Sequence, residues 1–314
     1  MSYKFLITGG SGFIGSNIVS KLLEDGYFVR ILDNFSTGKR ENIIGFQNYS
    51  NFEVIEGDLR SFHTVRKAVS GMDYILHLGA LPSVQRSIDD PITTNDVNVL
   101  GTLNILEAAK EFNIKKLVYS SSSSVYGDIE ILPKNEDLPV SPLSPYAISK
   151  YTAERYCKIF YDLYGLETVC LRYFNVFGPN QDPSSQYSAV IPKFIRLMLN
   201  DMEPVIYGDG KQSRDFTYVE NNVNANILSV FSSNISGNVY NIACGTRFNL
   251  NDLVRMVNKI LNKNIEPKYM ARKAGDVLHS LASIEKAKKD FDYKVSVDFE
   301  EGLSKMVDFM RKKM

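Results

Sequence analysis

Residues 8–16 read TGGSGFIGS and directly follow a short apolar run, YKFLIT at 3–8, which predicts a first strand. Within this stretch Gly9, Gly12 and Gly15 are spaced G-x-x-G-x-x-G, and an amphipathic pattern typical of a helix follows them. Glycines at a strand-to-helix turn let the backbone bend tightly and approach a pyrophosphate, whose charge is favoured by the free N–H groups at the helix start. The stretch therefore predicts a Rossmann-type dinucleotide site, although a glycine triplet alone would be weak support.

A carboxylate at the end of the second predicted strand strengthens this interpretation. Asp33 closes the strand at 27–33, where it can accept hydrogen bonds from an adenosine ribose and repel a 2′-phosphate. The pattern therefore favours NAD over NADP. Asp33 could instead be a turn residue in DNFSTG, although that alternative leaves the glycine motif unexplained. After the third predicted strand, EGDLR contributes Asp58, which we expect beside the adenine edge.

The first half of the chain alternates short apolar strands with amphipathic stretches. This alternation predicts an α/β fold of the Rossmann type, a doubly wound parallel sheet with helices on both faces. After about Asn175 the elements become shorter and more mixed, so we expect an NAD-binding Rossmann domain over 1–174, to which some later segments return, and a smaller C-terminal domain over 175–314. The predicted strands are 3–8, 27–33, 52–58, 73–79, 116–122 and 166–174, and the predicted helices are 14–25, 61–70, 96–111 and 146–164.

The composition is ordinary for a globular, enzyme-sized protein. The 314 residues are 44% hydrophobic and 23% charged, and 36 basic residues balance 36 acidic ones. A formal net charge of zero gives no reason to expect nucleic acid as a partner. Cys157, Cys170 and Cys244 are far apart and lie among apolar residues, which predicts reduced core thiols and a cytoplasmic protein.

The sequence lacks the signals of a secreted, membrane-bound or metal-binding protein. Met1 leads straight into the first predicted strand without a basic or cleavable apolar leader, and no run of about 18 apolar residues occurs, so we expect neither secretion nor membrane insertion. His63, His77 and His279 include no pair with ligand spacing. We therefore expect no metal site and assign none of the three a catalytic role.

Five consecutive serines stand before an aromatic residue and a glycine in YSSSSSVYGD at 119–128. Serine-rich tracts are commonly flexible linkers. Here the tract follows IKKLVY, and no enrichment in Gly, Ser or Pro continues beyond Gly127. We therefore place the serines at the end of the strand predicted over 116–122, the edge at which open α/β sheets bind ligands.

A tyrosine and a lysine follow in SPLSPYAISK. Ser144 and Pro145 are typical of a helix cap and a first helical residue, so Tyr146 and Lys150 should share one helix face. A nearby ammonium together with an oxidised nicotinamide would lower the pKa of the phenol and make it a base. An isolated Tyr-x-x-x-Lys is more often a packed tyrosine beside a solvated lysine. Together with the glycine motif and the serine-bearing strand, the pair is instead interpreted as catalytic.

Taken in order, these motifs resemble those of the extended short-chain dehydrogenases/reductases and, within them, the UDP-hexose 4-epimerases. The resemblance covers essentially the whole chain and is carried by TGGSGFIG, LDN, EGDLR, HLGA, NVLGT, SSSSVYG, YAISK, LRYFNVFGP, SRDFTYV and RKAGDVLHS.

The resemblance implies a catalytic group of Ser122, Tyr146 and Lys150. Ser122 would hydrogen-bond the sugar 4-hydroxyl and assist proton transfer to Tyr146, while Lys150 would hold the nicotinamide ribose and tune the phenol. Hydride would pass to NAD and return to the opposite face of a 4-ketosugar that has turned about its diphosphate. The implied NAD-binding residues are Gly9, Gly12, Phe13, Ile14, Gly15, Asp33, Asn34, Asp58, Leu59, Leu78, Ala80, Asn98, Tyr146 and Lys150.

The resemblance also implies that residues 175–314 form a UDP-sugar-binding domain. Asn175, Arg214 and Arg272 would hold the diphosphate, Tyr207 would stack on uracil and Asp276 would bind the uridine ribose; each arginine, taken alone, could equally be a surface residue in an ordinary salt bridge. A homodimer that pairs the helices at 96–111 and 146–164 is expected. The implied substrate residues are Ser83, Arg86, Ser122, Ser124, Tyr146, Asn175, Tyr207, Arg214, Arg272, Asp276 and Ser280.

The sugar itself is predicted from GDVLHS, which ends at Ser280. Similar enzymes that are narrow for UDP-glucose carry a bulky tyrosine at this position, so a serine would leave room for a 2-acetamido group. Ser83 and Arg86, in ALPSVQRSIDDPITTN, lie where similar acetamido-sugar epimerases line the pocket. We therefore expect interconversion of UDP-GlcNAc and UDP-GalNAc, with UDP-glucose and UDP-galactose as further substrates. Alternatively, Ser280 is a small surface residue and the preference is set elsewhere.

Two other functions share part of this pattern. A nucleotide-sugar dehydratase resembles the chain in cofactor and Tyr/Lys pair but carries acidic residues just after the catalytic hydroxyl, where this chain has Ser123 and Ser124. A non-catalytic NAD-binding protein typically loses the tyrosine or the lysine, and Tyr146 and Lys150 are both present. A 4-epimerase is therefore the favoured interpretation.

Overall fold

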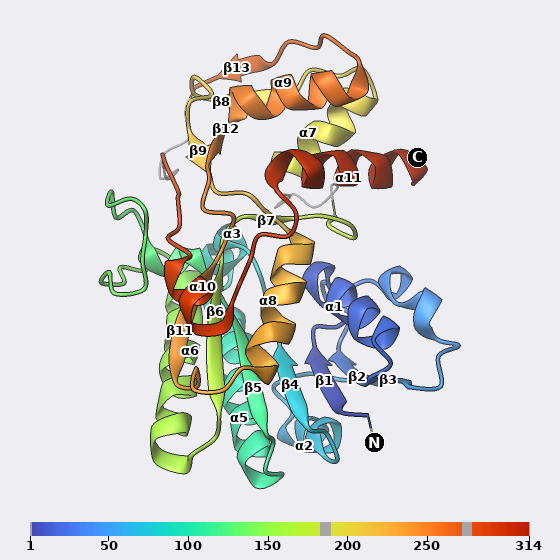
Figure 1. Ribbon diagram of the computed structural model, residues 1–314, viewed down its shortest axis with the longest axis vertical. Coiled ribbons are helices and arrows are strands. Elements are labelled where there is room, and N and C mark those ends of the chain that lie inside the picture. The colour runs from blue at the N-terminus through green and yellow to red at the C-terminus, as the bar shows by residue number, and fades with distance from the viewer. Residues whose placement is uncertain (1, 183–189, 272–277, 314) are drawn as a thin grey trace.

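A seven-stranded parallel sheet forms the centre of the protein, in a computed structural model that describes residues 2–182, 190–271 and 278–313 (Figure 1). The strand order β3-β2-β1-β4-β5-β6-β11 reverses direction between β1 and β4, the arrangement of a doubly wound Rossmann sheet. The predicted fold class is therefore confirmed. The strands are β1 (Lys4–Thr8), β2 (Phe28–Asp33), β3 (Phe52–Glu56), β4 (Tyr74–His77), β5 (Lys116–Ser122), β6 (Thr168–Tyr173) and β11 (Asn238–Ile242).

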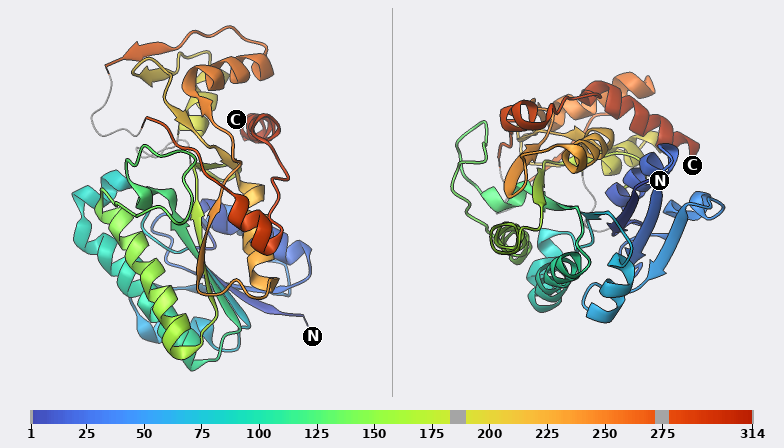
Figure 2. Two further views of the ribbon diagram at one scale, coloured as in Figure 1. Left: turned by 60° about the vertical axis from the view of Figure 1, so that its left-hand side comes forward. Right: turned by 60° about the horizontal axis from the view of Figure 1, so that its bottom comes forward.

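Helices cover both faces of this sheet because successive side chains of a strand point to opposite sides. In β1, Phe5 and Ile7 join the apolar cluster on one face while Leu6 joins the cluster on the other, and all three are fully buried. Figure 2 shows α5 and α6 side by side on the Leu6 face, where α2 also packs. The first face carries α1 (Phe13–Glu24) and α8 (Val219–Phe231), and the second carries α2 (Phe62–Val69), α5 (Gly101–Glu111) and α6 (Pro145–Tyr164).

The longest of these helices, α6, begins and ends at residues whose chemistry favours a helix boundary. The Ser144 hydroxyl accepts a hydrogen bond from the Ala147 amide at 3.1 Å, Pro145 occupies the first turn, and Gly165 ends the helix in the left-handed conformation. The predicted cap is thus confirmed, and it fixes where the first turn of α6 meets the sheet.

The helix predicted over 96–111 differs in its first turn. Residues Asp96–Leu100 form a wider π-helical turn, η3, which follows α4 (Pro91–Asn95) and leads into α5. This turn brings Asn98 into the interior, where its side chain bonds the backbone of Leu81. Further short helical segments between the sheet elements are α3 (Val84–Asp89), η1 (Arg40–Asn42) and η2 (Ile44–Phe46).

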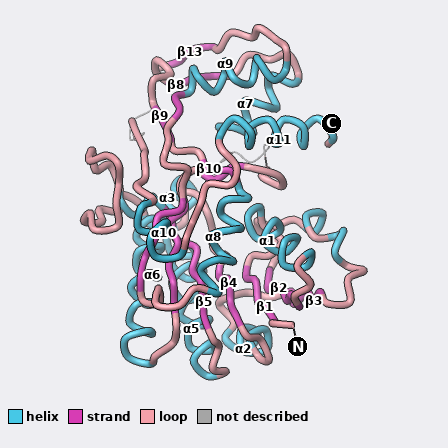
Figure 3. Tube along the Cα trace, viewed as in Figure 1, coloured by secondary structure: helices cyan, strands magenta, loops and turns pink. Residues whose placement is uncertain are grey.

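The C-terminal part lies beyond the carboxyl ends of the strands and is built from short paired strands and three helices (Figures 1 and 3). Its core is an aromatic cluster around Phe299, whose ring lies 4.4 Å from Phe248 and 5.2 Å from Phe216. The elements are α7 (Val190–Leu199), α9 (Leu250–Leu261), α11 (Phe299–Lys312) and the strand pairs β7 (Val176–Phe177) with β10 (Thr217–Tyr218), β9 (Ser213–Arg214) with β12 (Phe248–Asn249), and β8 (Val205–Tyr207) with β13 (Lys268–Met270).

The two parts of the chain share one apolar core. Phe299 belongs to the same buried cluster as Phe5 and Ile7 of the central sheet. β11 extends the sheet next to β6, and α10 (Glu285–Phe291) packs against β11. The division at residue 175 remains a prediction. Within the described ranges, every helix is too short or too polar to cross a membrane.

Candidate active site

The glycine loop between β1 and α1 forms a tight backbone cradle. Gly9 has a φ of +69°, and its carbonyl accepts a hydrogen bond from the Gly12 amide at 3.0 Å. A β-carbon on Gly15 would lie 2.1 Å from the Gly9 carbonyl oxygen, so only glycine fits there. Gly12 caps α1 without a side chain, which leaves the start of the helix suited to an anion. This loop fits the pyrophosphate of a dinucleotide.

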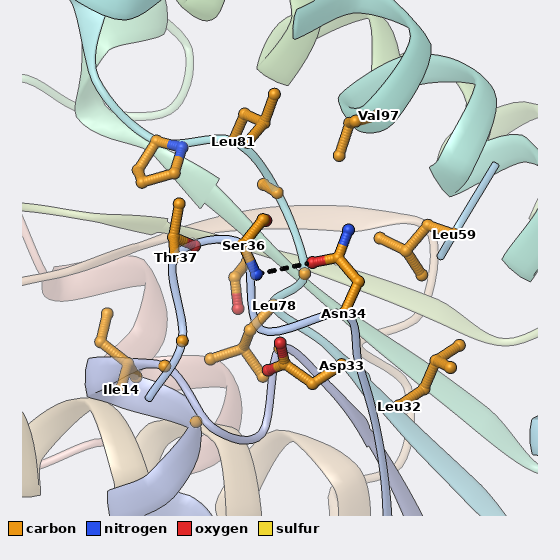
Figure 4. A pocket seen from close by; sticks show the side chains of 18 of the residues that line it. Ile14, Leu32, Asp33, Asn34, Ser36, Thr37, Leu59, Leu78, Leu81 and Val97 are labelled. Carbon is orange, nitrogen blue, oxygen red and sulfur yellow. Dashed lines mark hydrogen bonds between the residues drawn. The ribbon is translucent and has the colours of Figure 1, made fainter. Parts of the chain in front are cut away.

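Asp33 lies at the other end of the same site, where β2 stops. Its carboxylate accepts hydrogen bonds from the Ser11 amide at 3.0 Å and the Phe35 amide at 2.9 Å, and it is 8% exposed. These bonds tie the glycine loop to the end of β2 and keep the carboxylate at the pocket wall. Figure 4 shows Asp33 beside Asn34, whose side-chain oxygen accepts the Ser36 amide at 3.1 Å.

Asp58 lies across from Asn34, at the end of β3. Asn34 donates to its carboxylate at 3.0 Å, and Arg60 donates to the same group from its guanidinium at 2.8 Å. These hydrogen bonds, with Arg60 the strongest cause, lower the pKa of Asp58 to about 2. Asp58 is therefore a fixed acceptor throughout the neutral range.

One pocket joins this nucleotide end to two of the predicted catalytic residues, Tyr146 and Lys150. The segment Ser36–Gly38 also lines it and was missed from the sequence, although DNFSTG directly after Asp33 was the available signal. Asn98 does not line the pocket: it is buried behind the wall, where it accepts from the Leu81 amide at 2.7 Å and donates to Ser149. The predicted residues in the lining are Gly9, Gly12, Phe13, Ile14, Gly15, Asp33, Asn34, Asp58, Leu59, Leu78, Ala80, Tyr146 and Lys150.

The three predicted catalytic side chains come from only two elements, the carboxyl end of β5 and the first two turns of α6. The phenol of Tyr146 lies near the Ser122 hydroxyl, which acts to lower its pKa, and the ammonium of Lys150 lies 6.0 Å from the centre of the Tyr146 ring. Lys150 is 4% exposed and donates to the Ser120 carbonyl at 2.8 Å. The structure therefore places Tyr146 and Lys150 at one wall of the pocket, with Ser122 close to Tyr146 but outside the pocket lining.

Burial in the protein interior is the main cause of the pKa shifts of Tyr146 and Lys150. Burial raises the pKa of Tyr146, although the nearby Ser122 hydroxyl acts to lower it. Burial also lowers the pKa of Lys150 to about 8, against the attraction of Glu154. The sequence led us to expect a lowered phenol pKa from Lys150 and an oxidised nicotinamide together; the protein's own groups alone produce the opposite direction for Tyr146. Positive charge brought by an oxidised nicotinamide would act in the opposite direction to burial and lower the pKa of the phenol.

His77 belongs to a buried polar chain behind the pocket. Its Nδ1 lies 2.6 Å from the Thr8 hydroxyl and its Nε2 lies 3.0 Å from the Thr102 hydroxyl. Thr8 accepts from the Gly79 amide and Thr102 donates to the Asn98 carbonyl, so the imidazole carries its hydrogen on Nε2. Burial and the neighbouring Lys150 lower the pKa of His77 to about 3. The ring is neutral and structural, in keeping with the absence of a catalytic assignment.

The predicted sugar-binding residues near β4 and β5 are held by local backbone contacts. Ser83 has a φ of +93° and caps α3 by accepting from the Arg86 amide. A non-glycine residue in this conformation is strained, which is a feature concentrated at ligand sites. Ser124, in the short segment η4 (Ser123–Tyr126), donates its amide to Ser122 at 3.2 Å.

Of the predicted diphosphate and uridine residues that the structure describes, Arg214 lies on β9. Arg214 donates to the Ser213 carbonyl at 3.0 Å and the Leu278 carbonyl at 3.1 Å, and the Ser280 amide donates to the Ser213 carbonyl at 3.0 Å. Ser280 is 8% exposed. Tyr207 ends β8, on a neighbouring strand pair. Arg272 and Asp276 lie outside the described residues.

Asp215, which the sequence did not single out, holds this region together. Its buried carboxylate accepts from the amides of Cys244 at 3.0 Å, Gly245 at 3.1 Å and Ala282 at 3.2 Å, and Asn175 donates to its backbone carbonyl. Burial raises the pKa of Asp215 to about 7, although the three amides lower it. SRDFTYV contains this residue, but an aspartate beside an arginine predicts a surface pair, and only the fold shows its burial.

The described part of the chain holds no metal-binding cluster. Within residues 2–182, 190–271 and 278–313, three or more His, Cys, Asp or Glu side chains nowhere gather closely enough to hold a metal ion. The described site therefore offers a dinucleotide cradle, a buried ammonium and a phenol–hydroxyl pair as its chemical groups.

Comparison with known proteins identifies a family and relatives that this chain resembles. Residues 5–243 match the NAD dependent epimerase/dehydratase family. A putative UDP-glucose 4-epimerase of Methanocaldococcus jannaschii is 38% identical over 307 residues, which cover 98% of each chain.

Solved structures extend this similarity to the whole fold. The UDP-N-acetylglucosamine 4-epimerase of Methanobrevibacter ruminantium M1, in complex with UDP-N-acetylmuramic acid, has a TM-score of 0.95 and 43% identity, covering 100% of this chain and 99% of that one. The UDP-glucose 4-epimerase of Thermotoga maritima, with UDP-glucose, has a TM-score of 0.93 and 35% identity, covering 99% of both chains.

The glycine cradle predicts a specific loss of NAD binding. Gly15→Ala should weaken NAD binding by about tenfold or more, because its methyl group collides with the Gly9 carbonyl and such overpacking costs about 1–3 kcal/mol. Gly45→Ala is the matched control, since a β-carbon there meets nothing within 4 Å. Titration calorimetry with NAD measures both, and equal affinity in the two variants would contradict the role of the cradle.

Proposed function

The chain belongs to the NAD-dependent epimerase/dehydratase family, in the UDP-hexose 4-epimerase branch of the extended short-chain dehydrogenases/reductases, and on that premise we propose that it is an isomerase that inverts carbon 4 of a UDP-hexose with NAD as cofactor. The observation that carries the proposal is the placement of the Tyr146 phenol and the Lys150 ammonium at the same pocket as the glycine cradle, with Ser122 beside them at the end of β5.

The chemistry of the protein in this reaction is proton transfer and positioning. NAD, when bound, supplies the hydride acceptor and donor at carbon 4. Ser122 lies near Tyr146, and a sugar 4-hydroxyl placed between their two hydroxyl groups can pass its proton to the phenolate oxygen. Lys150 stays fixed on the Ser120 carbonyl and keeps a positive charge near the phenol, which favours the phenolate form.

The second half of the reaction needs the 4-keto form of the sugar to turn before the proton returns. We assign the grip on the rest of the substrate to Asn175 and Arg214, together with Arg272 and Asp276. Asn175 and Arg214 flank Asp215, whose three backbone bonds hold their segments in place. Binding energy at this non-reacting end can then position the sugar without holding the ring itself.

The sugar we propose is an N-acetylated hexose, so that UDP-GlcNAc and UDP-GalNAc are interconverted, with the plain UDP-hexoses as further substrates. Ser280 supports this choice because its small side chain stands beside the Arg214 segment and its backbone is bonded to Ser213. The similar enzyme from Methanobrevibacter ruminantium is named for UDP-N-acetylglucosamine, which agrees with a pocket that accepts the acetamido group.

The dehydratase alternative receives no support from the segment after the catalytic hydroxyl. Loss of the 6-hydroxyl requires an acid and a base near carbons 5 and 6. η4 presents Ser123 and Ser124 there, which cannot supply a carboxylate.

The three cysteines are free thiols, which supports a cytoplasmic location.

Removal of the Tyr146 hydroxyl tests the catalytic assignment. Tyr146→Phe should lower kcat by about 10²- to 10⁴-fold, because the general base is lost while little packing changes. NAD and UDP affinities should stay within about twofold of the parent protein. Tyr151→Phe, in the next turn of α6, is the control and should keep full turnover. Activity of Tyr146→Phe close to that of the parent would refute the assignment.

Enlargement of the side chain at position 280 tests the choice of sugar. Ser280→Tyr should lower kcat/KM for UDP-GlcNAc about tenfold or more relative to UDP-glucose, because the phenol fills the space of the acetamido group. Ser233→Tyr, on an exposed loop, should leave the ratio unchanged. Product analysis by NMR with both substrate pairs gives the ratios. Absence of UDP-GlcNAc turnover in the parent enzyme, or an unchanged ratio in Ser280→Tyr, argues against this pocket.

A homodimer through the helices at 96–111 (η3 and α5) and 146–164 (α6) is the assembly we propose. Large apolar side chains stand exposed there: Leu100 is 44% exposed on η3, and Leu163 and Ile148 are 69% and 53% exposed on α6. Such a group is typical of an interface that a second subunit covers. Light scattering should give twice the mass of the chain for the parent and for Met202→Asp, and the monomer mass for Leu163→Asp; a monomeric parent protein would contradict the proposal.

A further inference from the structure

Glu154 is a buried carboxylate that the proposed reaction does not use. It lies one helical turn after Lys150 on α6 and is 3% exposed. Burying a charge in this way is costly unless the charge is paired and hydrogen-bonded. Its partners therefore indicate what the residue contributes.

The first partner joins the helix to the strand that carries Ser122. The Ser121 hydroxyl donates to the Glu154 carboxylate at 2.5 Å, and Ser121 is the residue between Ser120 and Ser122. The Ser120 carbonyl already accepts from Lys150. Two consecutive residues of β5 are thus bonded to side chains one turn apart on α6. These bonds fix the position of the helix along the strand, and with it the approach of Tyr146 to Ser122.

The second partner balances the charge. Arg172 of β6, 4% exposed, donates to the two carboxylate oxygens of Glu154 from Nε at 2.9 Å and from Nη2 at 2.8 Å. Its guanidinium also lies 4.7 Å from the centre of the Tyr126 ring. A bidentate arginine compensates the charge of a carboxylate inside the protein. Glu154 is therefore a paired carboxylate close to the active-site ammonium.

The groups around Lys150 show why this charge matters. On α6 they are Glu154, Cys157 and the Tyr146 ring; on β5 they are the Tyr119 ring, 5.0 Å from the ammonium, and the Ser120 carbonyl. On β4 the nearby group is the neutral imidazole of His77. Burial lowers the pKa of Lys150, and among these groups the Glu154 carboxylate opposes it most strongly.

We propose that Glu154 is a positioning residue that sets the register of α6 on β5 and retains the positive charge of Lys150. The proposal rests on the proposed epimerase function, but its first half concerns geometry and its second half concerns a titration that needs no substrate. Glu154 acts through Ser121 and Lys150, so a change at this position should alter the active site without any contact to sugar or NAD.

The charge is tested by following Lys150 directly. In full-length protein labelled with [ε-¹³C]lysine, free of nucleotide sugar, the Lys150 signal is identified by its loss in Lys150→Ala and followed against pH. In the parent the midpoint should be about 8. In Glu154→Gln it should fall by about one pH unit or more, because an opposite charge at close range is removed. Ser121→Ala keeps the carboxylate and should leave the midpoint unchanged.

The register is tested by turnover in the same variants. Ser121→Ala should lower kcat roughly tenfold, with KM nearly unchanged, since the bond that places β5 against α6 is lost. In Glu154→Gln the alkaline limb of kcat/KM should move to lower pH in parallel with the Lys150 signal, because turnover needs the ammonium. Full kcat in Ser121→Ala overturns the register half of the proposal, and an unmoved Lys150 midpoint in Glu154→Gln overturns the charge half.

A second variant covers the case in which Glu154→Gln fails to fold because Arg172 is left unpaired. Glu154→Gln/Arg172→Met removes both charges, a change that buried ion pairs often tolerate. The Lys150 midpoint should still lie below that of the parent, because the carboxylate acts on Lys150 more strongly than the guanidinium does. A midpoint at or above the parent value overturns the charge half. Both titration midpoints are measured without turnover. A parent protein that lacks the proposed epimerase activity would therefore leave this test of Glu154 intact.

Discussion

The bond from the Lys150 ammonium to the Ser120 carbonyl, 2.8 Å long and closed to water, is the constraint around which the site is built. Moving an ammonium out of water costs several kcal/mol, so the surrounding structure must supply attraction. It does so with a carbonyl at the end of β5, the face of the Tyr119 ring and the carboxylate of Glu154. The result is a lysine close to its titration midpoint in the neutral range.

This constraint explains why the catalytic side chains come from one helix and one strand. A phenol that is to lose its proton needs a cation at a fixed distance, and a helix supplies that distance through the spacing of Tyr146 and Lys150. The strand supplies the hydroxyl of Ser122 and the carbonyl that fixes the lysine. The glycine cradle stands at the same edge because β1, β4 and β5 are neighbours and parallel, so their carboxyl ends meet.

The sequence was informative wherever the structural cause is local. The cap at Ser144 and the glycine turn at Gly9–Gly15 depend on neighbouring residues alone, and both could be predicted from residue type and spacing. The pairing of β11 with β6 joins segments far apart in the chain, and no local pattern specifies it. The burial of Asp215 is likewise not specified by a local pattern, because its three amide donors come from two other segments. Asn98 was predicted at the cofactor, but the π-helical turn directs its side chain to Leu81 and Ser149.

The two ends of the pocket are therefore built on different principles. The nucleotide end rests on one continuous motif, in which backbone geometry leaves little freedom for side chains. The proposed sugar end is assembled from separate segments that carry Ser83, Ser124, Arg214 and Ser280. Ser124 and Ser280 are bonded through their own backbone amides, whereas Ser83 accepts and Arg214 donates through its side chain. At Ser280, anchoring through the backbone leaves side-chain size free to vary. A change such as serine to tyrosine at position 280 can then alter the space around the sugar without moving the phenol, the ammonium or the carboxylate that holds them in register.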